Sequence, residues 1–156
     1  MKRWKKIGVG LLAILVLIQF FRPARNAGST DLVMDVTRIV NVPLPVQSLL
    51  KTSCYDCHSN HTNYPWYANL QPDGWLLANH IKEGKGELNF NEFGSYTKRR
   101  QLSKLKAIAG SVRDGSMPLS SYTLIHQNAK LSDEEKGLII GWAEETKDSL
   151  SSVYQK

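Results

Sequence analysis

Cysteine is scarce in this sequence: Cys54 and Cys57 are the two cysteines among 156 residues. A structural zinc site usually takes its four ligands from two separated pairs. This chain has no second cysteine pair, and His61 could only extend the same short loop. A thioredoxin-like redox pair needs a strand–helix–strand setting, and the residues that follow show little strand patterning. Zinc and thioredoxin-like chemistry are therefore disfavoured, whereas a disulfide or an inert pair remains an alternative.

Signatures of several enzyme classes are also missing. Gly84, Gly86 and Gly94 do not form the G-x-G-x-x-G pattern that cradles a phosphate. No catalytic triad is visible either. We therefore expect that this chain is not an enzyme.

Acidic residues are absent from the first 25 positions, where six of the 20 lysines and arginines lie. Residues 26–156 consequently carry 14 basic and 14 acidic side chains. A balanced charge gives nucleic acid no basic surface excess to recognise. We predict no nucleic-acid partner.

The first 25 residues resemble a membrane-directed segment, because four basic residues precede an apolar run from Ile7 to Ile18. Such a segment fits both a cleaved signal peptide and a signal anchor, and spanning a bilayer normally takes roughly 17 to 25 residues. Residues 24–27 offer no clear A-x-A cleavage site, since Arg25 lies within them. We therefore favour an anchor over residues 1–25. The leading positive charges predict a cytoplasmic N-terminus and a periplasmic remainder at a bacterial cytoplasmic membrane.

The two cysteines belong to the run Cys54-Tyr55-Asp56-Cys57-His58, a C-x-x-C-H motif. This spacing is the attachment signature of c-type haem. Two thiols on one helical turn can each add to a vinyl group of one porphyrin, and the imidazole that follows then lies beneath the iron. Export supports this interpretation, because an unused pair would tend to become a disulfide in an oxidising compartment. We predict one covalent haem c held by Cys54 and Cys57, with His58 as an axial iron ligand.

The second axial ligand is predicted in the turn-rich loop of residues 114–119. Met117 carries a soft thioether, which favours reduced iron, and Pro118 stiffens the loop that would hold it. The loop follows His58 by enough residues to return over the opposite face of the porphyrin. His80 and His126 are the alternatives to Met117 in this role.

An aromatic tract over residues 60–77 could form walls of the haem pocket. Trp66 or Trp75 could contact the haem or donate a hydrogen bond to one of its propionates. Ordinary core packing explains such side chains equally well. Both tryptophans are therefore candidate pocket residues.

The rest of the chain has helical patterning. Pro45 suits the first turn of a helix that would deliver the C-x-x-C-H motif. A second helix is predicted over residues 75–83, with Gly84 as its end, and a third over residues 97–113. A last helix is predicted from the capping box at residues 132–135 until near Ser149. Residues 84–96 are predicted to form a loop. The predicted organisation is an anchor at 1–25, an extended linker at 26–45 and a haem-binding domain at 46–150.

With these residues in view, the chain resembles a bacterial family of short, exported haem-binding domains of the cytochrome c type, with a single C-x-x-C-H motif. The segments that carry the resemblance are Ser53–Asn60, Tyr64–Tyr67, Asn79–Ile81, Leu88–Phe90, Met117–Leu119, Ser121–His126 and Leu131–Ser132. More loosely, C-x-x-C-H followed by Met-Pro and a capped terminal helix is similar to a class I cytochrome c. The resemblance implies an all-α domain around one covalent haem and a role in electron transfer. The long aromatic and glycine-rich middle departs from the class I pattern.

Together these inferences predict a membrane-anchored periplasmic monohaem cytochrome. It would exchange electrons with a redox partner protein that the sequence does not identify. The alternative is a haem-based sensor or a peroxidase-like protein, either of which needs an open or labile sixth position on the iron.

Overall fold

The computed structural model describes residues 2–29 and 32–154, and the fold over these residues is helical. The helices are α1 (Lys2–Ile18), α2 (Val36–Ile39), α3 (Leu44–Ser53), α4 (Tyr55–His58), η1 (Trp66–Asn69), α5 (Asp73–Glu87), η2 (Phe90–Ser95), α6 (Lys98–Arg113), α7 (Ser120–Ile125), η3 (Gln127–Ala129) and α8 (Asp133–Tyr154). Within the described ranges, β pairing is confined to one isolated bridge between Ala27 and His61. The all-α prediction is confirmed.

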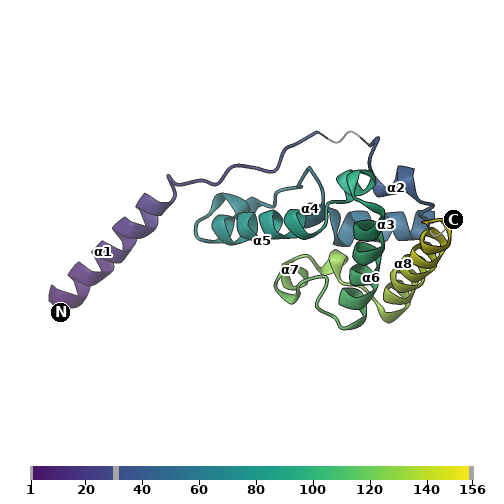
Figure 1. The fold of residues 1–156 in the computed structure, drawn as a ribbon. Coiled ribbons are helices and arrows are strands. Elements are labelled where there is room, and N and C mark those ends of the chain that lie inside the picture. Colours follow the sequence, from purple (N-terminus) through teal and green to yellow (C-terminus); the bar gives the residue numbers. More distant parts are fainter. Residues whose placement is uncertain (1, 30–31, 155–156) are drawn as a thin grey trace.

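Helix α1 projects from one end of the molecule, and the C-terminus lies at the opposite end (Figure 1). Its 17 residues leave their apolar side chains exposed. Among the described residues, we find no helix with both the length and the apolar character that crossing a membrane requires. The segment that follows α1 is tied to α5, because Trp75 Nε1 donates a hydrogen bond of 2.7 Å to the Phe21 carbonyl oxygen.

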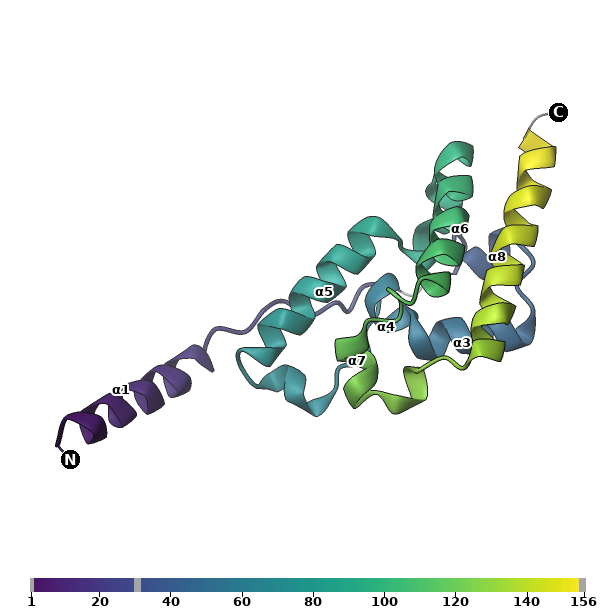
Figure 2. The same ribbon diagram turned by 90° about the horizontal axis from the view of Figure 1, so that it is seen from below.

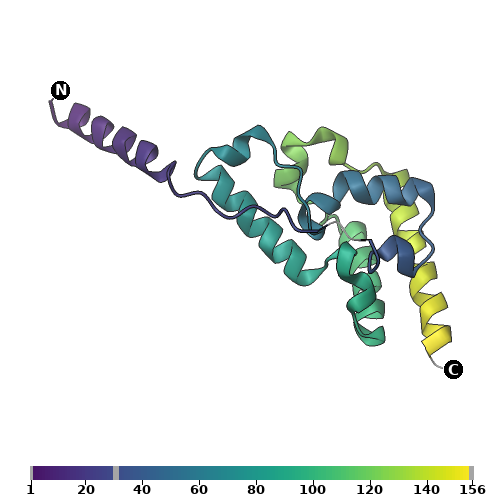
Figure 3. The same cartoon turned by 90° about the horizontal axis from the view of Figure 1, so that it is seen from above.

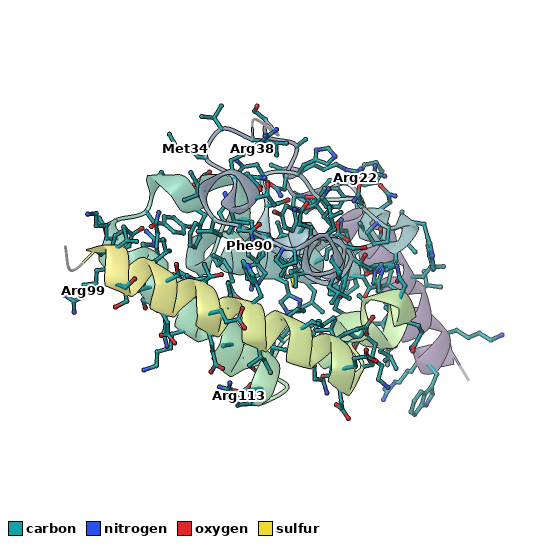
Figure 4. All side chains as sticks on the ribbon, turned by 90° about the vertical axis from the view of Figure 1, so that its right-hand side faces the viewer. Arg22, Met34, Arg38, Phe90, Arg99 and Arg113 are labelled. Carbon is teal, nitrogen blue, oxygen red and sulfur yellow. The ribbon has the colours of Figure 1, made fainter. Side chains whose placement is uncertain are left out.

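The core lies where α3, α6, α8 and η2 meet. Helices α6 and α8 lie side by side (Figure 2), and each presents a stripe of apolar residues at three- and four-residue spacing. Phe90, which is 1% exposed, lies in the middle of the molecule, whereas Arg99 and Arg113 lie at its edge (Figure 4). Full burial of one such apolar side chain stabilises a fold by about 1.5–3 kcal/mol. This core fixes the elements that carry the C-x-x-C-H motif.

Several helix boundaries agree with the predictions from sequence. Pro45 lies in the first turn of α3. Thr97 caps α6, since its Oγ1 accepts a hydrogen bond from Arg100 N. The capping box of α8 is present in both directions: Ser132 N donates to Glu135 Oε2 at 2.7 Å, and Glu135 N donates to Ser132 Oγ at 3.2 Å. The predicted end of this helix near Ser149 was wrong, because α8 continues to Tyr154. The Tyr154 hydroxyl donates a hydrogen bond to Gln101 Oε1.

The middle of the chain is more helical than predicted. Helix α5 continues through Gly84 to Glu87, and η2 follows within the predicted loop. Asn89 caps η2, since its Oδ1 accepts from Asn91 N at 3.1 Å. The close packing of Gly84 on the C-x-x-C-H segment, described below, is the reason for a glycine inside this helix.

Residues 26–45 were predicted to be an extended linker. Residues 26–29 run past α5, and residues 32–45 lie against the core (Figure 3). Asp35 caps the short helix α2 by accepting from Thr37 N at 2.9 Å. Val36 and Val42 are buried among the core residues. Trp142 of α8 donates from Nε1 to the Asn41 carbonyl oxygen at 3.0 Å. The second half of the segment is therefore part of the packed domain.

Candidate functional site

The two cysteines lie on one helical turn. Cys54 follows α3 directly, and its carbonyl oxygen accepts hydrogen bonds from Cys57 N at 3.2 Å and from His58 N at 2.9 Å. Both thiols are free and half-buried. Burial and the neighbouring Cys57 raise the pKa of Cys54 to about 12, and burial and Asp56 raise the pKa of Cys57 to about 11. The turn thus presents two protonated thiols to the same side as the next residue, His58.

His58 is held in one tautomer by backbone carbonyls. Its Nδ1 lies 2.9 Å from the Gly84 carbonyl oxygen and 3.0 Å from the Leu88 carbonyl oxygen. Because a carbonyl oxygen only accepts hydrogen bonds, Nδ1 carries the hydrogen and Nε2 keeps its lone pair. Burial lowers the pKa of His58, which favours the neutral ring. A neutral imidazole anchored through Nδ1 is the form in which histidine binds a metal through Nε2.

Gly84 brings α5 against the C-x-x-C-H turn. A Cβ at this position would lie 3.0 Å from the Cys57 carbonyl oxygen and 3.2 Å from Cys57 Cβ. Both distances are tighter than ordinary van der Waals contact. The absence of a side chain therefore allows the Gly84 carbonyl oxygen to reach His58.

A buried carboxylate fixes the motif from the other side. Asp35 is 1% exposed, and its Oδ2 accepts from Asn91 Nδ2 at 2.8 Å and from the Tyr55 hydroxyl at 3.2 Å. Tyr55 lies between the two cysteines, and its ring stacks on Phe90 with the ring centres 5.0 Å apart. Burial, followed by the Asp35 charge, raises the pKa of Tyr55. The position of the motif is thus set by residues from α2, α4 and η2.

Two cavities of about 220 Å³ and 330 Å³ lie beside this turn. Cys54, His58 and Met117 line both of them, and Cys57 lines the larger. The smaller cavity has largely apolar walls, formed by Leu50, Leu88, Phe90, Ile108, Val112 and Ile139. Taken together, the cavities fall in the range of roughly 300–1,000 Å³ typical of cofactor and small-molecule sites.

The comparison with known proteins adds the family. A family model described as a haem-binding domain matches residues 13–145 of this chain. The chain belongs to the haem-binding domain family. Searches of curated proteins and of solved structures gave no match.

The residues of the site fit the haem that this family binds. Two thiols, an imidazole with Nε2 directed to metal binding and the thioether of Met117 line cavities with apolar walls. Haem iron takes one or two axial ligands from protein and its other four from the porphyrin. In the part of the chain that the structure describes, we find no group of three or more His, Cys, Asp or Glu side chains that could hold a metal ion. The two thiols, the imidazole and the thioether suit a haem, because the porphyrin supplies the other four iron ligands.

The structure separates the two alternative histidines. His80 is half-buried and lines the larger cavity, together with Met117. His126 lines neither cavity; its Nε2 lies 2.8 Å from the Tyr67 hydroxyl, and its ring stacks on Tyr122 with the ring centres 4.3 Å apart. His80 thus remains the alternative to Met117, whereas His126 is engaged elsewhere.

The two tryptophans lie outside the cavities. Trp66 is 75% exposed and lines a neighbouring cavity of about 400 Å³ between α5 and α7. Trp75 is 39% exposed and directs Nε1 to Phe21. Neither tryptophan is among the residues that line the two cavities beside the C-x-x-C-H turn. The aromatic tract instead contacts the segment that follows α1 and the end of α7: Trp75 bonds to Phe21, and Tyr67 bonds to His126.

Several residues of the site were not singled out from sequence. Asp56, between the cysteines, accepts a hydrogen bond of 2.7 Å from the hydroxyl of Tyr122, which lines the larger cavity. Burial and then this bond raise the pKa of Tyr122. Gly84 and Asp35 were also missed. The unusual glycine content after His80 was the available signal for Gly84, whereas nothing in the sequence indicated that Asp35 reaches Tyr55.

Proposed function

We propose that this haem-binding protein is a monohaem c-type cytochrome that carries electrons and is not an enzyme. The single observation that carries the proposal is the convergence of Cys54, Cys57, His58 and Met117 on one pair of cavities. Haem supplies one-electron chemistry at its iron when bound. The chain would hold it, exclude water with apolar walls and set its potential through the axial ligands and burial.

Cys54 and Cys57 would attach the group covalently. Each Sγ–H adds across one vinyl C=C bond: sulfur bonds to the carbon next to the ring, and the hydrogen ends on the outer carbon. The addition balances without an oxidant or a reductant. It leaves His58 Nε2 to bind the iron on one side.

Met117 is the proposed second axial ligand. It lines both cavities, as His58 does, and its backbone N–H donates to the Ser111 carbonyl oxygen at 3.0 Å, which fixes the loop at the end of α6. A thioether raises the potential of a His-ligated haem. A stable His/Met pair supports electron transfer, because both axial positions stay filled.

The proposal places the protein at a bacterial cytoplasmic membrane, with α1 as a single-pass anchor and the haem-binding domain in the periplasm. Supporting features are the basic start of the chain, the exposed apolar side chains of α1 and the balanced charge of the remainder. Sedimentation of the full chain with membranes, and its resistance to alkaline extraction, test this part. Release by alkali would contradict the anchor and would indicate peripheral binding to the membrane instead.

The test of the main proposal is an optical spectrum of the full chain produced with a c-type maturation system. Haem that survives acid–acetone extraction establishes the thioether bonds. In the oxidised protein we expect the weak long-wavelength band of Met-ligated haem, lost in Met117→Ala and kept in Met34→Ala, since Met34 lies outside both cavities. Covalent haem without this band and with rapid CO binding would favour a sensor or a peroxidase-like protein, with His80→Ala as the next variant. No covalent haem would overturn the proposal.

A further inference from the structure

The charged side chains around the two cavities are unevenly distributed. Asp56, Glu83 and Glu87 line the larger cavity. Glu87 also lines the smaller cavity, where it meets Lys104 of α6. Among the described residues that line either cavity, Lys104 is the one with a formal positive charge at neutral pH. The site therefore has an acidic side and a side with a single cation.

This distribution matters because haem has two chemically different edges. The vinyl groups that react with cysteines lie on one side of the porphyrin, and two propionates lie on the opposite side. Cys57 lines the larger cavity alone, and Cys54 lines both. A haem attached through its vinyl groups at these thiols would have its propionates on the side away from Cys57, where Lys104 lines the smaller cavity.

A propionate that enters the smaller cavity would need a partner. An anion taken out of water is costly unless it is paired or hydrogen-bonded. Asp56 and Glu83 would repel a carboxylate, whereas the Lys104 ammonium would attract it. The side chain of Lys104 is only 19% exposed, so its charge lies at the cavity wall, where solvent screens it weakly.

The present partner of Lys104 is easily displaced. Lys104 Nζ lies 3.2 Å from Glu87 Oε2, but the Glu87 side chain is 83% exposed. An exposed carboxylate gains little from such a pair, about 0–1 kcal/mol, because water solvates it when the pair opens. The flexible four-carbon stem of lysine then allows the ammonium to turn toward a new anion.

We propose that Lys104 binds a haem propionate, exchanging Glu87 for it, and so fixes the orientation of the haem in the site. This inference rests on the proposed function, since it needs covalent haem at Cys54 and Cys57. It adds a specific contact on α6, a helix that carries neither the thiols nor the axial ligands. Lys104 is accordingly a positioning residue for the haem.

The experiment uses the full chain with covalent haem, compared with Lys104→Met and with Lys106→Met, an exposed lysine of the same helix. Two quantities are measured: the resonance Raman bending bands of the propionates and the reduction potential. We expect the propionate bands to shift in Lys104→Met alone. We also expect its potential to fall below that of Lys106→Met, because removal of a nearby positive charge favours the oxidised iron.

Each outcome decides a separate point. A lower potential with unchanged propionate bands would show a through-space charge effect and overturn the contact. Equal propionate bands and equal potentials in Lys104→Met and Lys106→Met would also overturn the contact. If Lys104→Met does not fold, NMR of the reduced wild-type protein replaces it: a nuclear Overhauser effect between the Lys104 ε-methylene and a propionate methylene supports the contact, and its absence overturns it. Wild-type protein without covalent haem would overturn the proposed function and this inference together.

Discussion

His58 Nδ1 lies 2.9 Å from the carbonyl oxygen of Gly84. The contact joins the last residue of the C-x-x-C-H motif to the last turn of α5, 26 positions further along the chain. It depends on the missing side chain at Gly84, because a Cβ there would meet the Cys57 carbonyl oxygen at 3.0 Å. The positions of His58 and of the neighbouring Cys57 thus depend on one glycine.

Gly84→Ala should therefore disturb the site although alanine favours helix. We expect α5 to move off the motif, with a loss of about 1–3 kcal/mol in the free energy of unfolding, as for other overpacked contacts. Urea unfolding of the haem-free protein and the yield of covalent haem measure the two effects. The matched control is Gly86→Ala in the same helix, where a Cβ meets nothing within 4 Å. That change should stabilise the protein by about 0.5–1 kcal/mol, and similar results for both variants would contradict the role of Gly84.

The burial of His58 predicts how the stability of the haem-free protein depends on pH. Burial lowers the pKa of His58 below its ordinary value of 6.5. At pH values between the folded and unfolded pKa, the unfolded chain binds the proton that the folded protein does not, so stability rises with pH. The free energy of unfolding should be at its plateau above pH 6.5 and decrease as the pH falls below it.

This decrease should be smaller in His58→Gln, which removes the titrating ring and keeps an N–H donor for the carbonyls of Gly84 and Leu88. His61→Gln is the control, because His61 is exposed. Urea titrations at a series of pH values give the slope for each variant. An unchanged slope in His58→Gln would assign the pH dependence to another group.

Asp35 should contribute strongly to stability, since it is buried and accepts hydrogen bonds from Thr37, Tyr55 and Asn91. Asp35→Ala leaves those donors without their partner, which costs about 1–3 kcal/mol for each buried unsatisfied group. We expect a large decrease in the urea midpoint and a smaller one for Tyr55→Phe, which removes a single donor. Asp148→Ala, at an exposed position of α8, should change the midpoint little. A small effect of Asp35→Ala would mean that water replaces the carboxylate.

The sequence was sufficient to predict the contacts that are local. The turn of C-x-x-C-H, the helix predicted over residues 97–113 and the capping box at Ser132 each depend on residues within a few positions of one another. His58 and Met117 line the same cavities, and their roles as iron ligands stay a prediction.

The sequence was insufficient where one distant contact outweighs a local preference. Gly84 indicates the end of a helix by its own propensity, yet packing on Cys57 keeps it inside α5. The β-branched residues before Pro43 favour an extended strand. Asp35 instead caps α2 and accepts hydrogen bonds from Asn91 and Tyr55. Trp75 points toward the segment that follows α1 because the Phe21 carbonyl oxygen accepts its hydrogen bond, which no pattern within residues 60–77 could reveal.

The thiols of the folded, haem-free protein should react slowly with alkylating agents. Burial raises the pKa of Cys54 to about 12 and, with Asp56, that of Cys57 to about 11, whereas an unperturbed thiol has a pKa of about 8.5. Because the thiolate is the nucleophile, the fraction able to react at neutral pH is much smaller in the folded protein.

Iodoacetamide labelling at pH 8, followed by mass spectrometry, should be many times slower in native buffer than in urea. In native buffer the labelling rate should keep rising as the pH increases beyond 9. For the unfolded chain, the labelling rate should level off above pH 9. Equal rates in both conditions would contradict the predicted burial. If the difference is found, thioether formation would be faster before the domain folds, because the thiols of the unfolded chain are accessible and a larger fraction of them is ionised.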